Sequence, residues 1–257
     1  MPSENEQVEL QQTIYTSSNP TRRWLHCTRR DWIINAIHTV GNQRQRALEV
    51  GPGSGIYVPV LAQLYDEVVA LDIEQAYLNH VNHLTRTTKN LAIKIDDITC
   101  SSLPSASFDL ILCTEVVEHL PDSSSALREM RRLLRPNGVL ILSTPQRYSP
   151  LEVTAKIAFL PGIINLVRLI YQEPILETGH INLMTAHQMV QQLKHAGFHI
   201  QQSYKSGLYI PLVAEFFGAS GLKAEQWIES KLRGSPFDGL LWTQYYVARP
   251  DFCPRTE

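Results

Sequence analysis

The chain has 257 residues and a formal net charge of −2, with 44% hydrophobic and 19% charged residues. This composition excludes wholesale disorder and is typical of a globular protein with a sizeable core. The charge balance argues against a protein that wraps nucleic acid, because that class needs an excess of Lys and Arg.

Short apolar strands alternate with amphipathic helices along most of the chain. A helix over 21–40 comes first, because Trp24, Trp32 and Ile37 follow helical spacing. We expect strands at 47–50, 67–73, 91–96, 108–114, 139–144, 198–204 and 241–248. We expect further helices at 56–66, 74–84, 122–134 and 185–196, and around 212–217 and 223–233. This alternation predicts an α/β fold with a mostly parallel sheet and helices on both faces.

A glycine-rich turn joins the first strand to the next helix. In the segment Glu49-Val50-Gly51-Pro52-Gly53-Ser54-Gly55, the glycines let the backbone approach a ligand without Cβ atoms in the way. Asp72 ends the second strand about twenty residues later, where a carboxylate can accept hydrogen bonds from both hydroxyls of a ribose. Alternatively, Asp72 is an acid at a helix start. Together, the turn and the acid predict a bound cofactor that carries a ribose; the glycine run by itself is alternatively only a tight turn.

The spacing of the glycines separates two classes of cofactor. A nicotinamide fingerprint requires GxGxxG, and Ile56 stands where its third Gly would be. The pattern here is GxGxG, with Glu49 two residues before the first Gly. A nicotinamide-dependent oxidoreductase and a non-catalytic cofactor-binding protein remain as alternatives.

This turn resembles motif I of the class I S-adenosylmethionine-dependent methyltransferases. The resemblance covers about residues 45–200 and includes the methyltransferase type 11 subgroup, with the ubiquinone-biosynthesis O-methyltransferases. It is carried by Asp96-Asp97-Ile98, Leu103-Pro104, Phe108-Asp109-Leu110-Ile111, Thr114-Glu115-Val116-Val117-Glu118-His119-Leu120, Leu133-Leu134-Arg135-Pro136-Asn137-Gly138-Val139-Leu140, Gly179-His180-Ile181-Asn182-Leu183 and Ala196-Gly197-Phe198. It implies a Rossmann-like, doubly wound sheet of seven strands with the last strand antiparallel.

The resemblance also implies S-adenosyl-L-methionine as the cofactor. The residues expected to bind it are Glu49, Gly51, Gly53, Gly55, Asp72, Ile73, Asp97, Ile98, Thr114 and Glu115. Either Asp96 or Asp97 would face the adenine, and we favour Asp97 because Ile98 then follows as an apolar cover for the ring.

Two histidines are candidates for the catalytic chemistry. A sulfonium methyl group is already activated, so a base is needed only when the acceptor arrives protonated. His119 and His180 are the candidate bases, since both lie at the rim where open α/β folds bind ligands. Each is alternatively a structural histidine that holds a loop. We find no three-cysteine radical cluster and no carboxylate set that requires a metal, and we expect none to be bound.

Two segments outside the core are open to several interpretations. The helix that carries Arg22-Arg23-Trp24 and Arg29-Arg30 is a lid whose Arg reaches the cofactor carboxylate, a contact for an anionic acceptor or lipid, or a solvated helix face. The apolar segment Leu151–Tyr171, broken at Pro161-Gly162, covers the acceptor, packs into the core, or lies on a membrane surface.

We therefore predict a single methyltransferase domain over 1–257. Its parts are a helical lead-in over 1–44, a cofactor-binding core over 45–145, an acceptor-side insertion over 146–184, and the rest of the sheet with a helical insertion over 185–257. We expect methyl transfer to a small apolar or aromatic acceptor, with oxygen as the acceptor atom. Four Cys without a CxxC pair and a polar, acidic start predict a cytoplasmic protein. A peripheral membrane contact through 151–171 is an option, no nucleic-acid partner is expected, and a protein or RNA methyltransferase is a further alternative.

Overall fold

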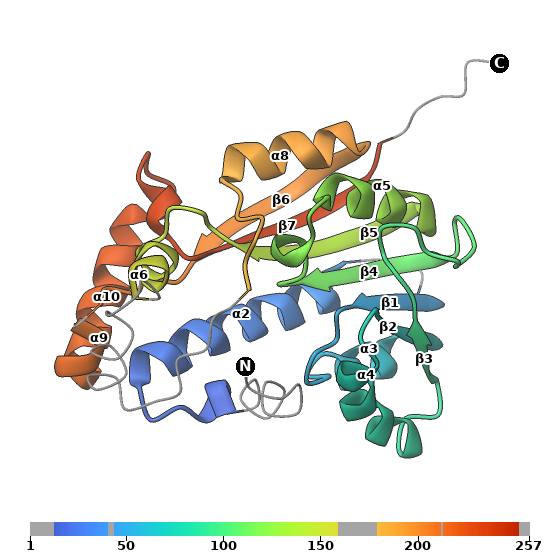
Figure 1. Cartoon of the computed structure of the whole chain (residues 1–257), viewed down its shortest axis with the longest axis horizontal. Helices are drawn as coiled ribbons and strands as arrows, with labels where there is room; N and C mark the ends of the chain where they lie inside the picture. The colour runs from blue at the N-terminus through green and yellow to red at the C-terminus, as the bar shows by residue number, and fades with distance from the viewer. Residues whose placement is uncertain (1–12, 41–43, 159–178, 212, 252–257) are drawn as a thin grey trace.

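The apolar runs of the sequence form seven strands of one sheet, in the order β3-β2-β1-β4-β5-β7-β6 (Figure 1). The strands are β1 (Arg46–Val50), β2 (Glu67–Asp72), β3 (Leu91–Ile95), β4 (Phe108–Thr114), β5 (Leu134–Pro145), β6 (Phe198–Ser206) and β7 (Thr243–Pro250). The computed structural model describes residues 13–40, 44–158, 179–211 and 213–251. Neighbouring strands from β3 to β5 are parallel, and β7 runs antiparallel to both β5 and β6. The predicted sheet, with its antiparallel last strand, is confirmed.

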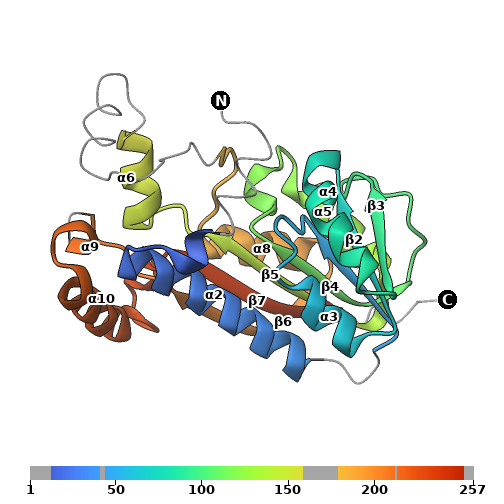
Figure 2. The same ribbon diagram turned by 90° about the horizontal axis from the view of Figure 1, so that it is seen from below.

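Helices cover both faces of this sheet. The helices of the described residues are α2 (Pro20–Thr39), α3 (Val58–Leu64), α4 (Gln75–Asn82), α5 (Ser123–Leu133), α6 (Pro150–Ala158), α8 (Ala186–His195), α9 (Val213–Phe216) and α10 (Gly218–Leu232). Of these, α6, α9 and α10 lie together beyond one end of the sheet (Figures 1 and 2). Short 3-10 helices lie at Ile14–Thr16, His83–Arg86, Val117–His119 and Asp238–Leu240. Local chemistry fixes several boundaries. Asn19 accepts a hydrogen bond from the Arg22 amide at the start of α2, and Thr185 and Gln188 form the predicted capping box of α8.

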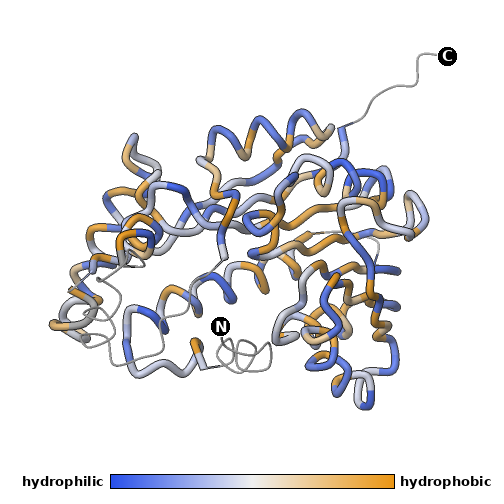
Figure 3. Tube along the Cα trace, viewed as in Figure 1, coloured by the Kyte–Doolittle hydropathy of each residue, from blue (hydrophilic) through white to orange (hydrophobic). Residues whose placement is uncertain are grey.

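Two hydrophobic clusters hold the helices to the sheet. Met130 of α5 and Met189 of α8 belong to the cluster on one face, and Ile33 of α2 and Leu61 of α3 belong to the cluster on the other. Figure 2 shows α2 and α3 together on one side of the strands. Each of these four side chains is fully buried, which contributes about 1.5–3 kcal/mol per side chain. Apolar residues lie mainly along the strands and inner helix faces (Figure 3).

The start of β5 differs from the prediction. The sequence placed a helix over 122–134 and a strand from residue 139, with Gly138 ending the helix. The structure ends α5 at Leu133 and begins β5 directly at Leu134. Gly138 lies within β5, where an added Cβ would come within 2.9 Å of the Leu134 side chain and 3.0 Å of the Phe108 carbonyl oxygen. Close packing, and not a helix end, therefore explains this glycine.

The predicted insertion over 146–184 is described only in part. Its first helix is α6, and an isolated parallel bridge joins Gln146 to Met184. The break at Pro161-Gly162 and most of the segment 151–171 lie outside the described residues. Cys27, Cys100 and Cys113 are free thiols, as predicted.

The topology brings the predicted site residues to one edge of the sheet. Because β1, β2, β4 and β5 are parallel, their carboxyl ends share that edge. The glycine turn follows β1, Asp72 is the last residue of β2, and the segment from Glu115 to His119 follows β4.

Candidate active site

The glycine turn after β1 packs tightly against the segment after β4. Gly51, Gly53 and Gly55 all have positive φ angles, of 65°, 51° and 73°. An added Cβ on Gly51 would lie 2.4 Å from the Val116 side chain, and its amide donates to the Leu71 carbonyl oxygen at 2.9 Å. Glycine is the amino acid that tolerates a positive φ where no space is left for a Cβ. The turn therefore has the form that the sequence predicted.

Glu49 lies beneath this turn and is buried without a partner. The residue is 1% exposed, and neither carboxylate oxygen has a hydrogen-bond partner in the described part of the chain. Burial raises the pKa of Glu49 to about 8. A buried, unpaired carboxyl group is costly, so this group is suited to a cationic ligand.

The end of β2 offers one polar and one apolar group. Asp72 Oδ1 accepts a hydrogen bond from the Glu74 amide at 2.9 Å, so the carboxylate also supports the start of α4. Burial raises the pKa of Asp72, and the backbone hydrogen bond opposes that shift. The Ile73 side chain is 63% exposed, which leaves an apolar surface beside the carboxylate.

Asp97, and not Asp96, has a free oxygen at the end of β3. Asp96 Oδ2 accepts hydrogen bonds from Ser101 and Ser102, while its Oδ1 accepts the Asp97 amide. Asp97 uses Oδ1 for Thr99, and its Oδ2 makes no hydrogen bond within the described residues. The preference for Asp97 fits this geometry. Ile98, however, is 4% exposed and packs in the core, so Ile73 is the apolar side chain available to a ring.

Glu115, which follows Thr114 at the end of β4, forms an ion pair with Arg29. Arg29 of α2 donates to Glu115 Oε2 at 2.6 Å, and Ser143 donates to Oε1 at 2.9 Å. Glu115 has a φ of 56°, which is uncommon for a residue with a side chain. Arg29 also lies 5.1 Å from the centre of the Trp242 ring. One interpretation of the sequence let an Arg of this helix reach the cofactor carboxylate; the structure pairs Arg29 with Glu115.

The two predicted histidines lie side by side. The ring centres of His119 and His180 are 5.1 Å apart. His119 Nδ1 donates to the Gly179 carbonyl oxygen at 3.3 Å, and His180 Nδ1 lies 3.0 Å from Glu152 Oε2. Partial burial of the ring and the nearby His180 lower the pKa of His119, so its imidazole is neutral near pH 7.

Two acids that the sequence did not single out complete this cluster. Glu118 is fully buried; its Oε2 accepts a hydrogen bond from Thr144 at 2.9 Å, and its Oε1 has no partner in the described chain. Glu152 of α6 accepts the Trp242 indole N–H at 3.0 Å with its second oxygen. One potential ligand atom from each of Glu118, His119 and His180 lies within 4.8 Å of the other two. In the sequence, only its position next to His119 pointed to Glu118 as a site residue, and nothing pointed to Glu152.

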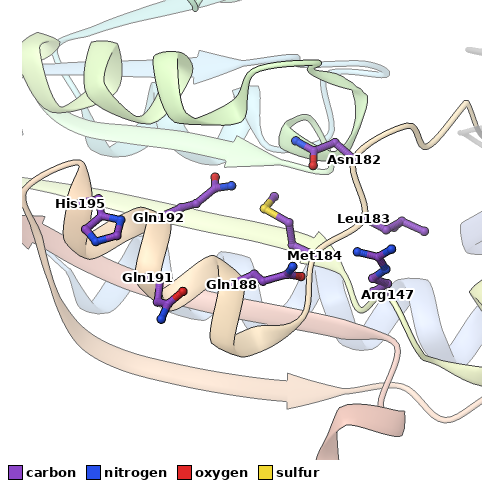
Figure 4. A pocket seen from close by; sticks show the side chains of 8 residues that line it. All are labelled: Arg147, Asn182, Leu183, Met184, Gln188, Gln191, Gln192 and His195. Carbon is purple, nitrogen blue, oxygen red and sulfur yellow. The ribbon is translucent and has the colours of Figure 1, made fainter.

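A separate pocket lies beside α8. It has a volume of about 230 Å³ and is lined by Arg147, Asn182, Leu183, Met184, Gln188, Gln191, Gln192 and His195 (Figure 4). None of the predicted cofactor or catalytic residues lines it. The lining offers amides and no paired acid and base, so we assign no chemistry to it. Among the described residues, no helix is long and apolar enough to cross a membrane.

Comparison with known proteins identifies relatives for most of the chain. The model of a family described as a methyltransferase domain matches residues 22–203. A "Probable S-adenosylmethionine-dependent methyltransferase" of Mycolicibacterium smegmatis is 26% identical over 206 residues, which is 79% of this chain and 71% of that protein. The ubiquinone biosynthesis O-methyltransferase of Pseudomonas fluorescens is 31% identical over 120 residues, which is 46% of this chain and about half (50%) of that protein.

A solved structure has the same fold. The N-methyltransferase of Bradyrhizobium japonicum, crystallised with S-adenosyl-L-homocysteine, is 16% identical and aligns with a TM-score of 0.60 over 96% of both chains. At this identity the likeness concerns the fold alone.

The ion pair of Arg29 leads to a prediction about stability. Arg29→Ala leaves Glu115 without its buried partner, so the free energy of unfolding should fall by about 3–5 kcal/mol. Arg30→Ala is the matched control, because Arg30 pairs with Asp31 at the surface and should change stability by less than about 1 kcal/mol. Urea denaturation followed by circular dichroism measures both variants. Equal losses would show that the Arg29 pair contributes no more than a surface contact.

Proposed function

The chain belongs to the S-adenosylmethionine-dependent methyltransferases, and on that premise we propose that it methylates an oxygen of a small apolar or aromatic acceptor. The observation that carries this proposal is the contact of His180 with Glu152 beside His119. A sulfonium methyl group needs help with a proton only when the acceptor arrives as a hydroxyl or phenol. The printed name of the Pseudomonas relative, an O-methyltransferase, favours the same atom.

The residues at the edge of the sheet fit the cofactor. The Glu49 carboxyl group, which has no partner among the described residues, suits an ammonium group, and Gly51 lets the turn pack against Val116 after β4. Asp72 would accept hydrogen bonds from the ribose, Ile73 would cover the adenine, and Asp97 would accept from its amino group. Gly53, Gly55, Thr114 and Glu115 remain proposed contacts, whereas the burial of Ile98 removes it from the set. When bound, S-adenosyl-L-methionine supplies a methyl group that the positive sulfur has already activated.

The chain's own residues would orient the acceptor and assist loss of its proton. Glu152 accepts from His180 Nδ1, which fixes the imidazole and leaves Nε2 as its free nitrogen. Trp242 in turn holds Glu152. Arg29 anchors α2 beside the end of β4, where the helix would exclude water from the reacting atoms. We propose His180 and His119 as the groups that assist proton loss.

We propose that the insertion over 146–184 covers the bound acceptor. Its described helix, α6, places Glu152 inward at His180 and leaves Val153 and Ile157 about half exposed. Two exposed apolar side chains four residues apart on one helix form an apolar stripe. This stripe would contact an apolar acceptor or a membrane surface. The cytoplasmic location remains a prediction from the sequence, as does the single domain over 1–257.

Membership of the methyltransferase family excludes the oxidoreductase alternative. One experiment distinguishes a small-molecule acceptor from a protein or RNA acceptor. Extracts of the host are incubated with the protein and a cofactor that carries a CD₃ group, and the label is followed by mass spectrometry. We expect the CD₃ group in a small molecule that lacks one free hydroxyl. Asp72→Ala is the control, because it should weaken cofactor binding and abolish the signal. Label confined to protein or RNA would contradict the proposal.

Glu49 leads to a prediction about pH. Because burial raises its pKa to about 8, the carboxyl group must lose a proton before it can pair with an ammonium group. Affinity for S-adenosyl-L-methionine should therefore rise up to about tenfold per pH unit between about pH 6 and 7.5. In the free protein the raised pKa has the opposite effect. The free energy of unfolding falls as pH rises from 4.5 towards 8, since the folded chain binds the extra proton there.

Calorimetric titration across this pH range tests the prediction. Glu49→Gln cannot ionise, so its affinity should be lower and nearly independent of pH. Glu67→Gln is the matched control, because Glu67 lies at the opposite end of β2 and pairs with Arg46. An unchanged pH profile in Glu49→Gln would remove Glu49 from the cofactor site.

The exposed stripe of α6 leads to a prediction about acceptor use. Ile157→Asp puts a charge where the acceptor would be covered, and that charge must lose water when the acceptor binds. Turnover should fall at least about tenfold, while cofactor affinity stays within a few-fold. Lys156→Ala is the control on the same helix. Flotation of both variants with liposomes tests the membrane contact, and full turnover by Ile157→Asp would contradict the acceptor-cover role.

A further inference from the structure

The pocket beside α8 has no acid–base pair for catalysis, but its polar groups suit it for binding. Four of its lining side chains lie on one face of α8, at helical spacing: Gln188, Gln191, Gln192 and His195. Arg147, which follows β5, lies at the opposite end of the pocket from His195, and the glutamines lie between them (Figure 4). Two segments far apart in the chain therefore border one hollow of about 230 Å³.

Two of these glutamines use their carbonyl oxygens elsewhere in the fold. Gln188 Oε1 accepts the Thr185 amide at 3.0 Å, and this contact fixes which way the Gln188 amide points, because a backbone N–H can only donate. Gln192 Oε1 accepts the Ser123 hydroxyl at 2.8 Å. The Nε2 groups of both glutamines make no hydrogen bond within the described residues. Each glutamine therefore offers the pocket N–H donors.

Arg147 adds a positive charge that the described part of the chain does not neutralise. Its backbone is held in place, because its amide donates to the Met184 carbonyl oxygen at 3.2 Å. Its guanidinium lies 5.7 Å from the centre of the Tyr148 ring and forms no ion pair or hydrogen bond among the described residues. No Asp or Glu of the described chain lines the pocket. Arg29 and Arg135, by contrast, each pair with a carboxylate.

We infer that this pocket binds a small molecule through a carboxylate or phosphate group. A guanidinium offers two parallel N–H donors to such an oxyanion, and the free amides of Gln188 and Gln192 add further donors. The amide oxygens of Asn182 and Gln191 accept no hydrogen bond in the described chain, so a hydroxyl of the same molecule also finds acceptors. Pockets for drug-sized ligands have volumes of about 300–1,000 Å³, so the volume of this pocket fits a smaller ligand.

This site is distinct from the cofactor site and adjoins the acceptor side. None of the proposed cofactor contacts lines it. Asn182 and Met184 follow His180 within four positions, and Arg147 follows the end of β5. The oxyanion therefore belongs either to the acceptor itself or to a free small acid. The inference concerns the oxyanion, so it holds for both sources and does not depend on the acceptor atom.

Titration of the full chain with inorganic phosphate tests the inference without any turnover. The ¹⁵N-labelled protein is titrated with sodium phosphate at pH 7 and followed by NMR, in the absence of cofactor and acceptor. Sodium succinate is the carboxylate probe, and sodium chloride controls for ionic strength. We expect saturable shifts of the side-chain amide signals of Gln188 and Gln192 with at least one of the two anions. Absence of saturable shifts with both anions would overturn the inference.

Variants locate the binding site. Gln188→Glu keeps an oxygen for the Thr185 amide, because Glu also serves in a capping box, but it puts a negative charge in place of the N–H donors. The melting temperature should stay close to that of the parent, while affinity for the anion falls at least about tenfold. Arg147→Ala should weaken the anion to a similar extent, since it removes a charged donor.

Arg86→Ala is the matched control. Arg86 is an exposed arginine that also forms no ion pair within the described residues, but it lies outside the pocket. Its replacement should leave anion affinity unchanged, whereas general attraction of anions to the surface would weaken equally in both arginine variants. Folded Gln188→Glu and Arg147→Ala proteins that bind the anion like the parent would show that the site lies elsewhere.

The CD₃ labelling experiment identifies the source of the oxyanion. Saturating phosphate should suppress labelling of the small molecule if the acceptor carries the oxyanion, and should leave labelling unchanged if the ligand is a free acid. The two proposals fail separately. If the anion binds in the pocket and no small molecule is labelled, the proposed function fails and the oxyanion site stands. If neither anion binds but a small molecule is labelled, the oxyanion site fails and the proposed function stands.

Discussion

The ion pair between Arg29 and Glu115 is the contact on which the arrangement of the site depends. It lies where the first long helix meets the end of β4, and it joins residues that are 86 positions apart in the chain. Glu115 adopts a left-handed backbone there, which costs roughly 1 kcal/mol or more unless the surroundings compensate. Arg29 and Ser143 supply that compensation by holding both carboxylate oxygens. With Glu115 fixed, the next residues are directed towards the glycine turn and the histidine cluster.

The segment after β4 then connects the two halves of the site. Val116 fills the space that a Cβ on Gly51 would need, so the cofactor turn and this segment can pack only in one way. Two residues later, the Glu118 backbone oxygen accepts the amides of Ile181 and Asn182, which brings the insertion's end to the same place. The cofactor side and the acceptor side are therefore parts of one packed unit, which is what transfer between two bound molecules requires.

Patterns that act over a few residues were readable from the sequence, and contacts between distant segments were not. The strand and helix positions followed from periodicity, and the glycine turn followed from its own residues. Gly138 was misread because its role depends on Phe108, a residue of the neighbouring strand. His119 and His180 were placed on the same rim, but nothing in their spacing showed that their rings would touch. The roles of Glu152 and Arg29 depend on tertiary contacts. Glu152 contacts His180 and Trp242, and Arg29 pairs with Glu115.

The position of β7 has a consequence for how the chain assembles during synthesis. The ribosome makes β5 and β6 long before β7, yet these two strands are not neighbours, and β7 must enter between them. Until residues 243–250 leave the exit tunnel, β5 exposes an unpaired apolar edge, and β6 has no strand to pair with. Such open edges invite wrong pairing with other nascent chains. The part of the sheet formed by β5, β7 and β6 therefore completes only after β7 has been translated. Protection by chaperones matters most between the synthesis of β5 and that of β7.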